Sequence, residues 1–523
     1  MSSTDLIKED SPAASLSRIS SSIRQIPALD LLISCAISLP LASTTALEPA
    51  YHDGAIFMYV GEMWRRGLIP YLQVFDNKPP GIFFVTAIAS AFPHSFWILS
   101  FILFLFAMGC ILSVKKTLQI AGAPERTVFW GTIATALIVN LRYYGAGSSI
   151  TEPYMLAPMA ASMCAFAYAL RSGKLRYVFL AGVCSGIACA FKPFALSVFA
   201  AQVVFVIFHH APPSVFPGKV RAILGSILAN IAGAAAAWAP IFAYFALHGA
   251  LKQMLDASFF YNLHYGMASQ PKPLELLTSV AENLVPLSST LGCIFIGLVA
   301  LRRQPSRTPG KRSALWDLTL LWFAFSLVLV FMAGRGYRHY YLSLTPSLSV
   351  AAALVLWSLE DLEIAKNLRL AFYALLLSPI VMTQLPVVAE VVHDYNAAAH
   401  HSHDSIPVEV AATELKRIAP SSSTVFVWGF EPWMLSDTHL RSAFRFPTAQ
   451  YIYDSPRAYD VVGREILSGM QTTPPDFVVL TPWFFNMGWP HQSDPVQDEF
   501  MAIVHKSYAK VWEKDSFSLY KRN

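Results

Sequence analysis

Charged side chains gather in residues 48–94, between two long apolar runs. Asp53, Asp76 and Lys78 stand there among several aromatic residues. A carboxylate of this kind can act as a general base that activates a hydroxyl acceptor. A nearby lysine can bind a phosphate through charge-assisted hydrogen bonds, which are strong in a partly dry site. The segment therefore predicts a transfer reaction between a phosphate-bearing substrate and an acceptor.

Further ionisable residues stand at the ends of apolar runs later in the chain. They are Glu152 in "SSITEPY", Lys192 in "FKPFA", and Arg335 and His339 in "GRGYRHYY". The topology described below places all four on the same outer face as residues 48–94. Arginines there run against the positive-inside bias, which favours a functional role for them.

Each of these residues also has a structural interpretation. Asp53 could cap the helix that follows it, because Asp is a favoured N-cap. Asp76 stands before two prolines, where an Asx turn is common, and Glu152 suits the dipole of a helix start. The lysines could extend to lipid headgroups, and the arginine could bind anionic lipid. Because all of these residues lie on one face, a shared role in binding or catalysis is favoured over these separate structural roles.

The composition indicates a membrane protein. Of the 523 residues, 55% are hydrophobic and 14% are charged, whereas soluble domains carry about 25% charged residues. Long apolar runs continue to about residue 387, and an ordinary soluble composition follows. The net charge of +5 comes from basic residues in short loops between apolar runs. That distribution orients a protein in a membrane and does not indicate a nucleic-acid partner.

A membrane-spanning helix needs about 20 mostly apolar residues. About eleven segments approach this length, namely 27–47, 95–114, 127–143, 154–170, 176–191, 194–209, 221–247, 284–302, 315–333, 341–358 and 368–387. Lys and Arg concentrate in alternate loops, which puts the tail of residues 1–26 in the cytoplasm and the C-terminal region outside. The apolar segment "PPGIFFVTAIASAF" is too short to span and would invert this charge pattern. We expect it to lie against the outer face as an interfacial or re-entrant segment.

Residues 388–523 have the pattern of a soluble α/β domain. "PVEVAATELKRIA" and "SPRAYDVVGREILSGM" have helical spacing, and "TVFVWG" and "PDFVVLT" have the pattern of buried strands. "YAKVWEKDSFSLYKR" resembles a terminal hairpin, and "AAAHHSHDS" is interpreted as a linker. The predicted fold is therefore a polytopic α-helical membrane domain over residues 27–387, followed by an α/β domain on the outer face.

The segment from Asp53 to Pro80 resembles the first outer loop of the GT-C membrane glycosyltransferases, specifically the PMT/ArnT-like branch. In that group an acidic residue starts the loop helix, and a "G-x-x-P-Y" turn and an "F-D-x-K-P-P" run follow. This chain has them at residues 67–71 and 75–80. "TEPY", "FKP" and "GRGYRHYY" resemble further family segments and follow in the same order.

The resemblance implies an enzyme of the inner (plasma) membrane that transfers a sugar with inversion at the outer face. The donor would be a polyprenyl-phosphate-linked sugar, the group transferred a hexosyl or pentosyl unit, and the acceptor a glycan, lipid or protein. Asp53 would be the general base or acceptor-positioning group, and Lys78 would lie near the donor phosphate. Topology and charge lead us to add Arg335, His339 and Lys192 to the donor-phosphate site. Glu152, Asp76 and Tyr71 are assigned to the wall or acceptor side of the site.

Two departures from the family pattern bear on metal binding. Many members have a second acid directly after the first, where this chain has Gly54. Many also have Asp after the "P-Y" turn, where this chain has Gln73. We therefore assign no metal ligands, and we leave a divalent cation open as a cofactor.

Two other classes of protein compete with the enzyme. A transporter or flippase of a lipid-linked glycan would carry charges near the bilayer midplane and paired broken helices. The helix interiors here are nearly free of charge, and the two halves show no evident repeat. A non-catalytic assembly or sensor protein would use the outer domain as its working part, and Asp53 and Lys78 would then tolerate replacement by Ala.

Overall fold

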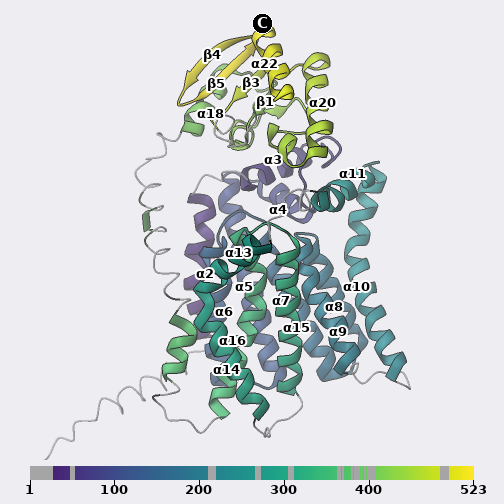
Figure 1. Ribbon diagram of the computed structural model, residues 1–523, viewed down its shortest axis with the longest axis vertical. Helices are drawn as coiled ribbons and strands as arrows, with labels where there is room; N and C mark the ends of the chain where they lie inside the picture. Colours follow the sequence, from purple (N-terminus) through teal and green to yellow (C-terminus); the bar gives the residue numbers. More distant parts are fainter. Residues whose placement is uncertain are drawn as a thin grey trace, which may run out of the picture.

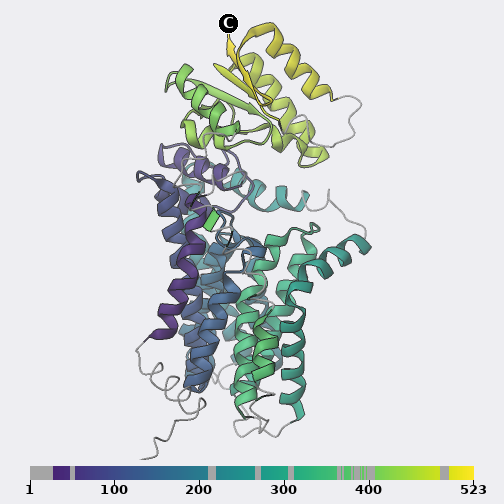
Figure 2. The ribbon, with the colours of Figure 1, turned by 90° about the vertical axis from the view of Figure 1, so that its left-hand side faces the viewer.

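A bundle of long helices carries a C-terminal α/β domain at one end (Figures 1 and 2). This computed structural model describes residues 28–47, 53–209, 219–264, 273–303, 311–361, 370–378, 407–482 and 494–523, with scattered further positions between 367 and 396. The end of the bundle beneath the α/β domain is called the domain-bearing face below. The predicted cytoplasmic tail and the "AAAHHSHDS" linker lie outside the described residues.

The helical part consists mainly of α-helices. They are α2 (Leu29–Leu47), α3 (Asp53–Arg65), α4 (Gly81–Ala89), α5 (Ser95–Ala121), α6 (Glu125–Val139), α7 (Glu152–Ser172), α8 (Leu175–Cys189), α9 (Leu196–His209), α10 (Lys219–Leu247), α11 (Leu251–Leu255), α13 (Pro273–Leu284), α14 (Ser288–Arg303), α15 (Lys311–Met332) and α16 (Thr345–Asp361). Shorter turns include 3₁₀ segments η1 (Arg142–Tyr144), η2 (Pro193–Ala195), η4 (Val285–Leu287) and η5 (Arg338–Leu344), and the π-helix η3 (Asp256–Tyr261).

Six helices in the described part of the chain are long and apolar enough to cross a membrane. They are α2, α5, α7, α10, α15, and α16 together with η5. Helices α8 and α9 are apolar but shorter, and half of the predicted segment 368–387 lies outside the described residues. These helices indicate a membrane-embedded protein, while the predicted count of about eleven spans stays a prediction. Helix α4 has nine residues, which is too short to span and agrees with the interfacial interpretation.

Small residues let the bundle helices approach closely. A Cβ on Gly182 of α8 would lie 2.0 Å from the carbonyl oxygen of Asn230, and a Cβ on Gly233 of α10 would lie 2.0 Å from that of Phe179. Only glycine fits such a backbone approach, which is a common way of packing membrane helices. Buried polar side chains join the same region, since Asn230 donates to Gln202 Oε1 at 2.9 Å.

The C-terminal domain is built on a five-stranded mixed sheet in the order β2-β1-β3-β5-β4. Its elements are α18 (Pro407–Ile418), β1 (Thr424–Trp428), α19 (Trp433–Thr438), β2 (Arg441–Ser442), η7 (Ala449–Tyr453), α20 (Pro456–Thr472), β3 (Phe477–Leu480), α22 (Pro495–Ser507), β4 (Tyr508–Lys514) and β5 (Phe517–Arg522). Strand β1 is parallel to β2 and β3, and β5 is antiparallel to β3 and β4. The two predicted helices, the two buried strands and the terminal hairpin are confirmed. The short elements between β1 and α20, and helix α22, were not predicted.

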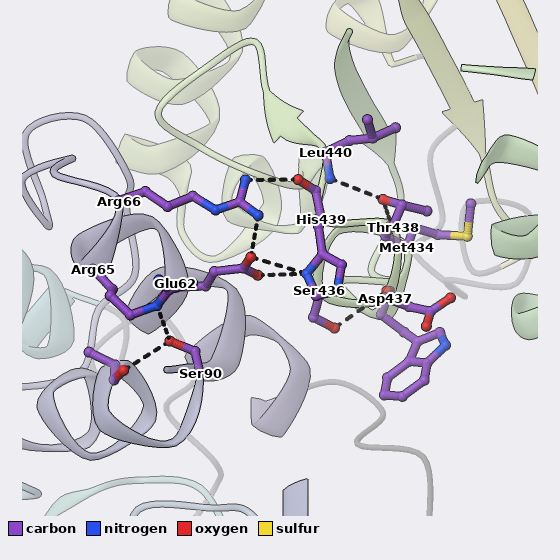
Figure 3. Close-up of polar contacts among 12 residues, drawn as sticks. Glu62, Arg65, Arg66, Ser90, Met434, Ser436, Asp437, Thr438, His439 and Leu440 are labelled. Atoms are coloured by element: carbon purple, nitrogen blue, oxygen red, sulfur yellow. Dashed lines mark hydrogen bonds and ion pairs between the residues drawn. The ribbon is translucent and has the colours of Figure 1, made fainter. Parts of the chain in front are cut away.

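The α/β domain contacts the first loop helix through an ionic cluster, which Figure 3 shows. Glu62 of α3 is 4% exposed, and its two carboxylate oxygens each lie 3.1 Å from His439 Nδ1. Arg66 joins the same carboxylate at 2.5 Å and also donates to the carbonyl oxygen of His439 at 3.1 Å. A second polar contact lies nearby, where the Ser442 backbone N–H donates to the Tyr59 hydroxyl at 2.8 Å. The domain is thus held against the bundle by specific bonds.

We expect this contact to weaken in acid and in the Glu62→Gln variant. Burial alone would raise the pKa of Glu62, but the hydrogen bond and charge of His439 and the charge of Arg66 hold it below its ordinary value of 4.5. A depressed carboxyl pKa contributes stability above the ordinary pKa and loses it as the pH falls through the lowered value. Glu62→Gln removes charge-assisted bonds and should cost about 1–3 kcal/mol of docking free energy.

Hydrogen–deuterium exchange in α19 and β2, corrected for the intrinsic rate at each pH, measures this docking. Wild-type protection should fall below about pH 4.5, whereas the Glu62→Gln variant should be less protected throughout and change little with pH. Glu414→Gln is the matched control, because Glu414 pairs with Arg417 on α18 of the α/β domain. Equal protection in the wild type and Glu62→Gln would contradict the assigned role.

Candidate active site

The loop after α3 folds back so that its "K-P-P" run lies under the α/β domain. Tyr71 has a positive φ of 68°, and its hydroxyl donates to the carbonyl oxygen of Lys78 at 2.7 Å. Asp76 Oδ1 accepts the Lys78 backbone N–H at 2.9 Å, which is the Asx turn expected before the two prolines. Tyr71 and Asp76 therefore fix the backbone that carries the lysine.

The side chain of Lys78 lies among polar and aromatic groups. Its Nζ donates to Asn77 Oδ1 at 2.7 Å and lies 5.7 Å from the centre of the Phe57 ring. The π-helix η3 packs against the same run, and the Asn262 amide that follows it donates to the carbonyl oxygen of Asn77 at 2.6 Å. π-Helical turns are rare and are often found at functional sites. Nothing in the sequence marked this segment.

A buried ion pair joins two of the predicted site residues. Lys192 Nζ contacts Glu152 Oε1, and the Glu152 side chain is 1% exposed. His339 Nε2 lies 3.7 Å from the same oxygen, so "TEPY", "FKP" and "GRGYRHYY" meet at one point. Lys192 is 9% exposed, which rules out the interpretation that it extends freely to lipid headgroups. Glu152 instead holds both basic groups.

Electrostatic interactions connect this ion pair with the first loop. The charges of Asp53 and Lys78 both act on Lys192 and on His339. Asp53 is the first residue of α3, and within the described residues its carboxylate has neither a hydrogen bond nor an ion pair. Glu152 contacts Lys192 and His339 directly, whereas Asp53 and Lys78 lie near enough for their charges to act on the two basic groups. These five residues are called the charged cluster below.

Asp76 and Arg335 lie at the edge of the charged cluster. Asp76 accepts bonds on both oxygens, from Lys78 N–H and from the Tyr451 hydroxyl at 2.8 Å. Burial raises the pKa of Asp76, although Lys78 and Tyr451 oppose that effect. Because both of its oxygens are engaged, Asp76 is a poorer candidate for a general base than Asp53. Arg335 Nη1 donates to the Tyr337 hydroxyl at 3.2 Å.

The α/β domain completes this region with residues that were not predicted. Tyr451 of η7 reaches Asp76, and Asp454 just after η7 accepts the Tyr261 hydroxyl on Oδ2 at 2.6 Å. The Phe75 backbone N–H also donates to the carbonyl oxygen of Arg445 at 2.7 Å. These contacts join residues that lie far apart in the chain, and no local motif surrounds them.

The described residues offer no group of three or more His, Cys, Asp or Glu side chains placed to hold a metal ion. The predicted linker histidines lie outside that part of the chain.

The chain has the fold of the GT-C membrane glycosyltransferases. It is similar to the crystal structure of ArnT from Cupriavidus metallidurans in the apo state, with a TM-score of 0.55, 12% identity, and coverage of 96% of this chain and 98% of that one. The same protein bound to undecaprenyl phosphate gives a TM-score of 0.53 at 12% identity, with 94% and 98% covered.

The archaeal oligosaccharyltransferase AglB from Archaeoglobus fulgidus, in complex with an inhibitory peptide and a dolichol-phosphate, is also similar. Its TM-score is 0.50 at 12% identity, with 88% of this chain and 70% of that one covered. No family model matches the sequence, and no curated protein matches it. At this level of identity the likeness establishes the fold, and the function has to be argued from the site.

Proposed function

We propose that the protein transfers a sugar from a polyprenyl-phosphate donor to an acceptor at the domain-bearing face, which is the outer face of the membrane. The observation that carries this proposal is the charged cluster. It places one carboxylate without a partner in the described residues, Asp53, beside a group of basic side chains. Two of the structurally similar proteins were solved with a polyprenyl phosphate or dolichol-phosphate, which supports the donor class.

The proposed reaction is an inverting displacement at the anomeric carbon. Asp53 accepts the proton of an acceptor hydroxyl as that oxygen attacks, and it later releases the proton to water. The bond between the anomeric carbon and the phosphate oxygen breaks, and its electron pair leaves with the polyprenyl phosphate. The products are the glycosylated acceptor, the polyprenyl phosphate and one proton.

The basic residues stabilise the charge that develops on the leaving phosphate. Lys78 is held by its backbone bonds next to the path of that phosphate. Glu152 holds Lys192 and His339 in place, so less side-chain reorganisation is needed when the donor binds. Fixed charges in a partly dry site act more strongly than mobile ones in water.

We expect Lys78→Ala to weaken donor use by about 10- to 100-fold, because a charge-assisted hydrogen bond contributes about 1.5–3 kcal/mol. The effect should appear in kcat/KM for a synthetic undecaprenyl-phosphate sugar, because Lys78 acts on the phosphate both when the donor binds and when charge develops on the leaving group. Lys252→Ala is the control, since Lys252 is exposed on α11 at the same face. An unchanged kcat/KM in the Lys78→Ala variant would remove this residue from the phosphate site.

A further inference from the structure

The C-terminal domain delivers a carboxylate to the candidate active site that the proposed reaction does not use. Asp454 follows η7, and its Oδ2 accepts the Tyr261 hydroxyl at 2.6 Å. The cations of Lys78 and Arg335 act on this carboxylate. The Tyr261 hydrogen bond holds Asp454 in place. Because the residue is only half-buried, part of it stays accessible.

Aromatic contacts fix this part of the domain over the first loop. The Phe75 ring lies 5.4 Å from the Tyr261 ring and 5.2 Å from the Tyr451 ring, both edge to face. Tyr451 also donates to Asp76. Three segments that are distant in sequence therefore hold Asp454 on the side of Lys78 that faces the α/β domain.

The two substrates reach this site from different sides. The lipid tail of a polyprenyl donor has to lie against the apolar helices, so its phosphate and sugar arrive from the bundle. Asp454 belongs to the domain that covers the bundle on its other side (Figures 1 and 2). A side chain in that position lies where a soluble acceptor, or the exposed headgroup of a lipid acceptor, approaches the site.

We propose that Asp454 binds the acceptor, by accepting a hydrogen bond from one of its hydroxyl groups, and that the C-terminal domain thereby takes part in acceptor selection. This inference rests on the proposed function. A carboxylate at this point favours a hydroxyl-rich acceptor such as a glycan headgroup, and it repels an acceptor that presents a phosphate there. Asp53 remains the base, and Asp454 is a positioning residue.

The proposal carries a pH dependence. Burial raises the pKa of Asp454 to about 6, although the Tyr261 hydrogen bond and the two cations oppose that effect. The titratable and charged groups that face Asp454 are Tyr261, Lys78, Arg335, Asp76 and Tyr451. The charged carboxylate is the stronger acceptor, so acceptor binding should weaken as the pH falls below about 6.

The test replaces Asp454 with Asn, whose carbonyl oxygen can still accept the Tyr261 hydroxyl. Transfer of a radiolabelled sugar is measured from a synthetic undecaprenyl-phosphate sugar to the membrane lipid fraction of cells that lack the protein. We expect the half-saturating amount of that fraction to rise about tenfold, while the affinity for undecaprenyl phosphate stays within about twofold. In the wild type this amount should rise as the pH falls below about 6, whereas in the variant it should not change with pH.

Two further variants separate acceptor binding from docking. Asp460→Asn, at an exposed position on α20, should behave as wild type. Tyr261→Phe should keep most acceptor binding, because the carboxylate remains. An equal loss in Tyr261→Phe, with faster hydrogen exchange in η7, would show that Asp454 only docks the domain and would overturn the proposal.

Two other results would also overturn it. In the first, Asp454→Asn weakens the binding of undecaprenyl phosphate by more than about fivefold, equivalent to about 1 kcal/mol. That result would assign the carboxylate to the donor side. The other is an Asp454→Asn variant that transfers sugar like an active wild type, which would count against this inference alone. A wild-type protein that transfers no sugar would instead count against the proposed function.

Discussion

Replacing Asp53 with Asn is expected to lower the rate of sugar transfer by about 10²- to 10⁴-fold, the usual contribution of a positioned general base. The amide cannot take the proton of the acceptor hydroxyl, yet it has nearly the same shape as the carboxylate. Undecaprenyl phosphate should therefore bind the variant as it binds the wild type. The measurement is single-turnover transfer from a synthetic undecaprenyl-phosphate sugar, together with binding of the lipid phosphate alone.

Asp256→Asn is the matched control for this experiment. Asp256 begins the π-helix η3 at the same face of the bundle, and its side chain is exposed. The control should transfer sugar at the wild-type rate. An Asp53→Asn variant that also keeps near wild-type activity would mean that Asp53 only starts helix α3, and the proposed mechanism would be wrong.

Replacing Lys192 with Met should have the largest effect on folding. The change leaves the Glu152 carboxylate buried without its cation, and breaking a buried pair in this way costs about 3–5 kcal/mol. We expect a lower thermal unfolding temperature of the purified protein and a loss of transfer at temperatures where the protein is still folded. The double variant Glu152→Gln/Lys192→Met should regain much of the stability, because no uncompensated charge remains.

A second buried pair in the bundle separates stability from function. Lys115 lies 2.6 Å from Asp30, and the two side chains are 19% and 7% exposed. Lys115 stands about 30 Å along α5 from its start near the α/β domain. Lys115→Met should therefore destabilise the protein while leaving transfer by the folded fraction unchanged. Equal losses of transfer in both lysine variants would remove Lys192 from the site.

The local patterns of the sequence predicted much of the fold. The lengths of the apolar runs predicted α2, α5, α7, α10 and α15. Helical periodicity and strand-like composition predicted the main elements of the α/β domain. The short 3₁₀ and π segments were not predicted, because their geometry depends on tertiary packing. Helix α6, with 15 residues, shows the limit of apolar length as a signal. It ends at Val139, before Asn140 and the turn η1, so the helix is shorter than the predicted segment 127–143 at its C-terminal end.

The residues of the candidate site were proposed one by one from the sequence, whereas the contacts between them were not predicted. Glu152 and Lys192 were each identified from motifs and topology, yet the sequence did not indicate that they bind each other. Asp454 and Tyr451 were missed because they reach Tyr261 and Asp76 only when the α/β domain is docked. The Asx turn at Asp76, predicted from the two prolines that follow it, is confirmed. Contacts between side chains that are hundreds of residues apart in the chain produce no local signal in the sequence.

The most direct test of the account uses the purified protein in lipid vesicles with a labelled synthetic undecaprenyl-phosphate sugar and the acceptor-containing lipid fraction. The account predicts that the label moves to a covalent product while undecaprenyl phosphate is released in equal amount, and that Asp53→Asn abolishes both. Movement of the intact donor across the vesicle membrane, with no cleavage and no covalent product, would contradict it and would identify a transporter instead.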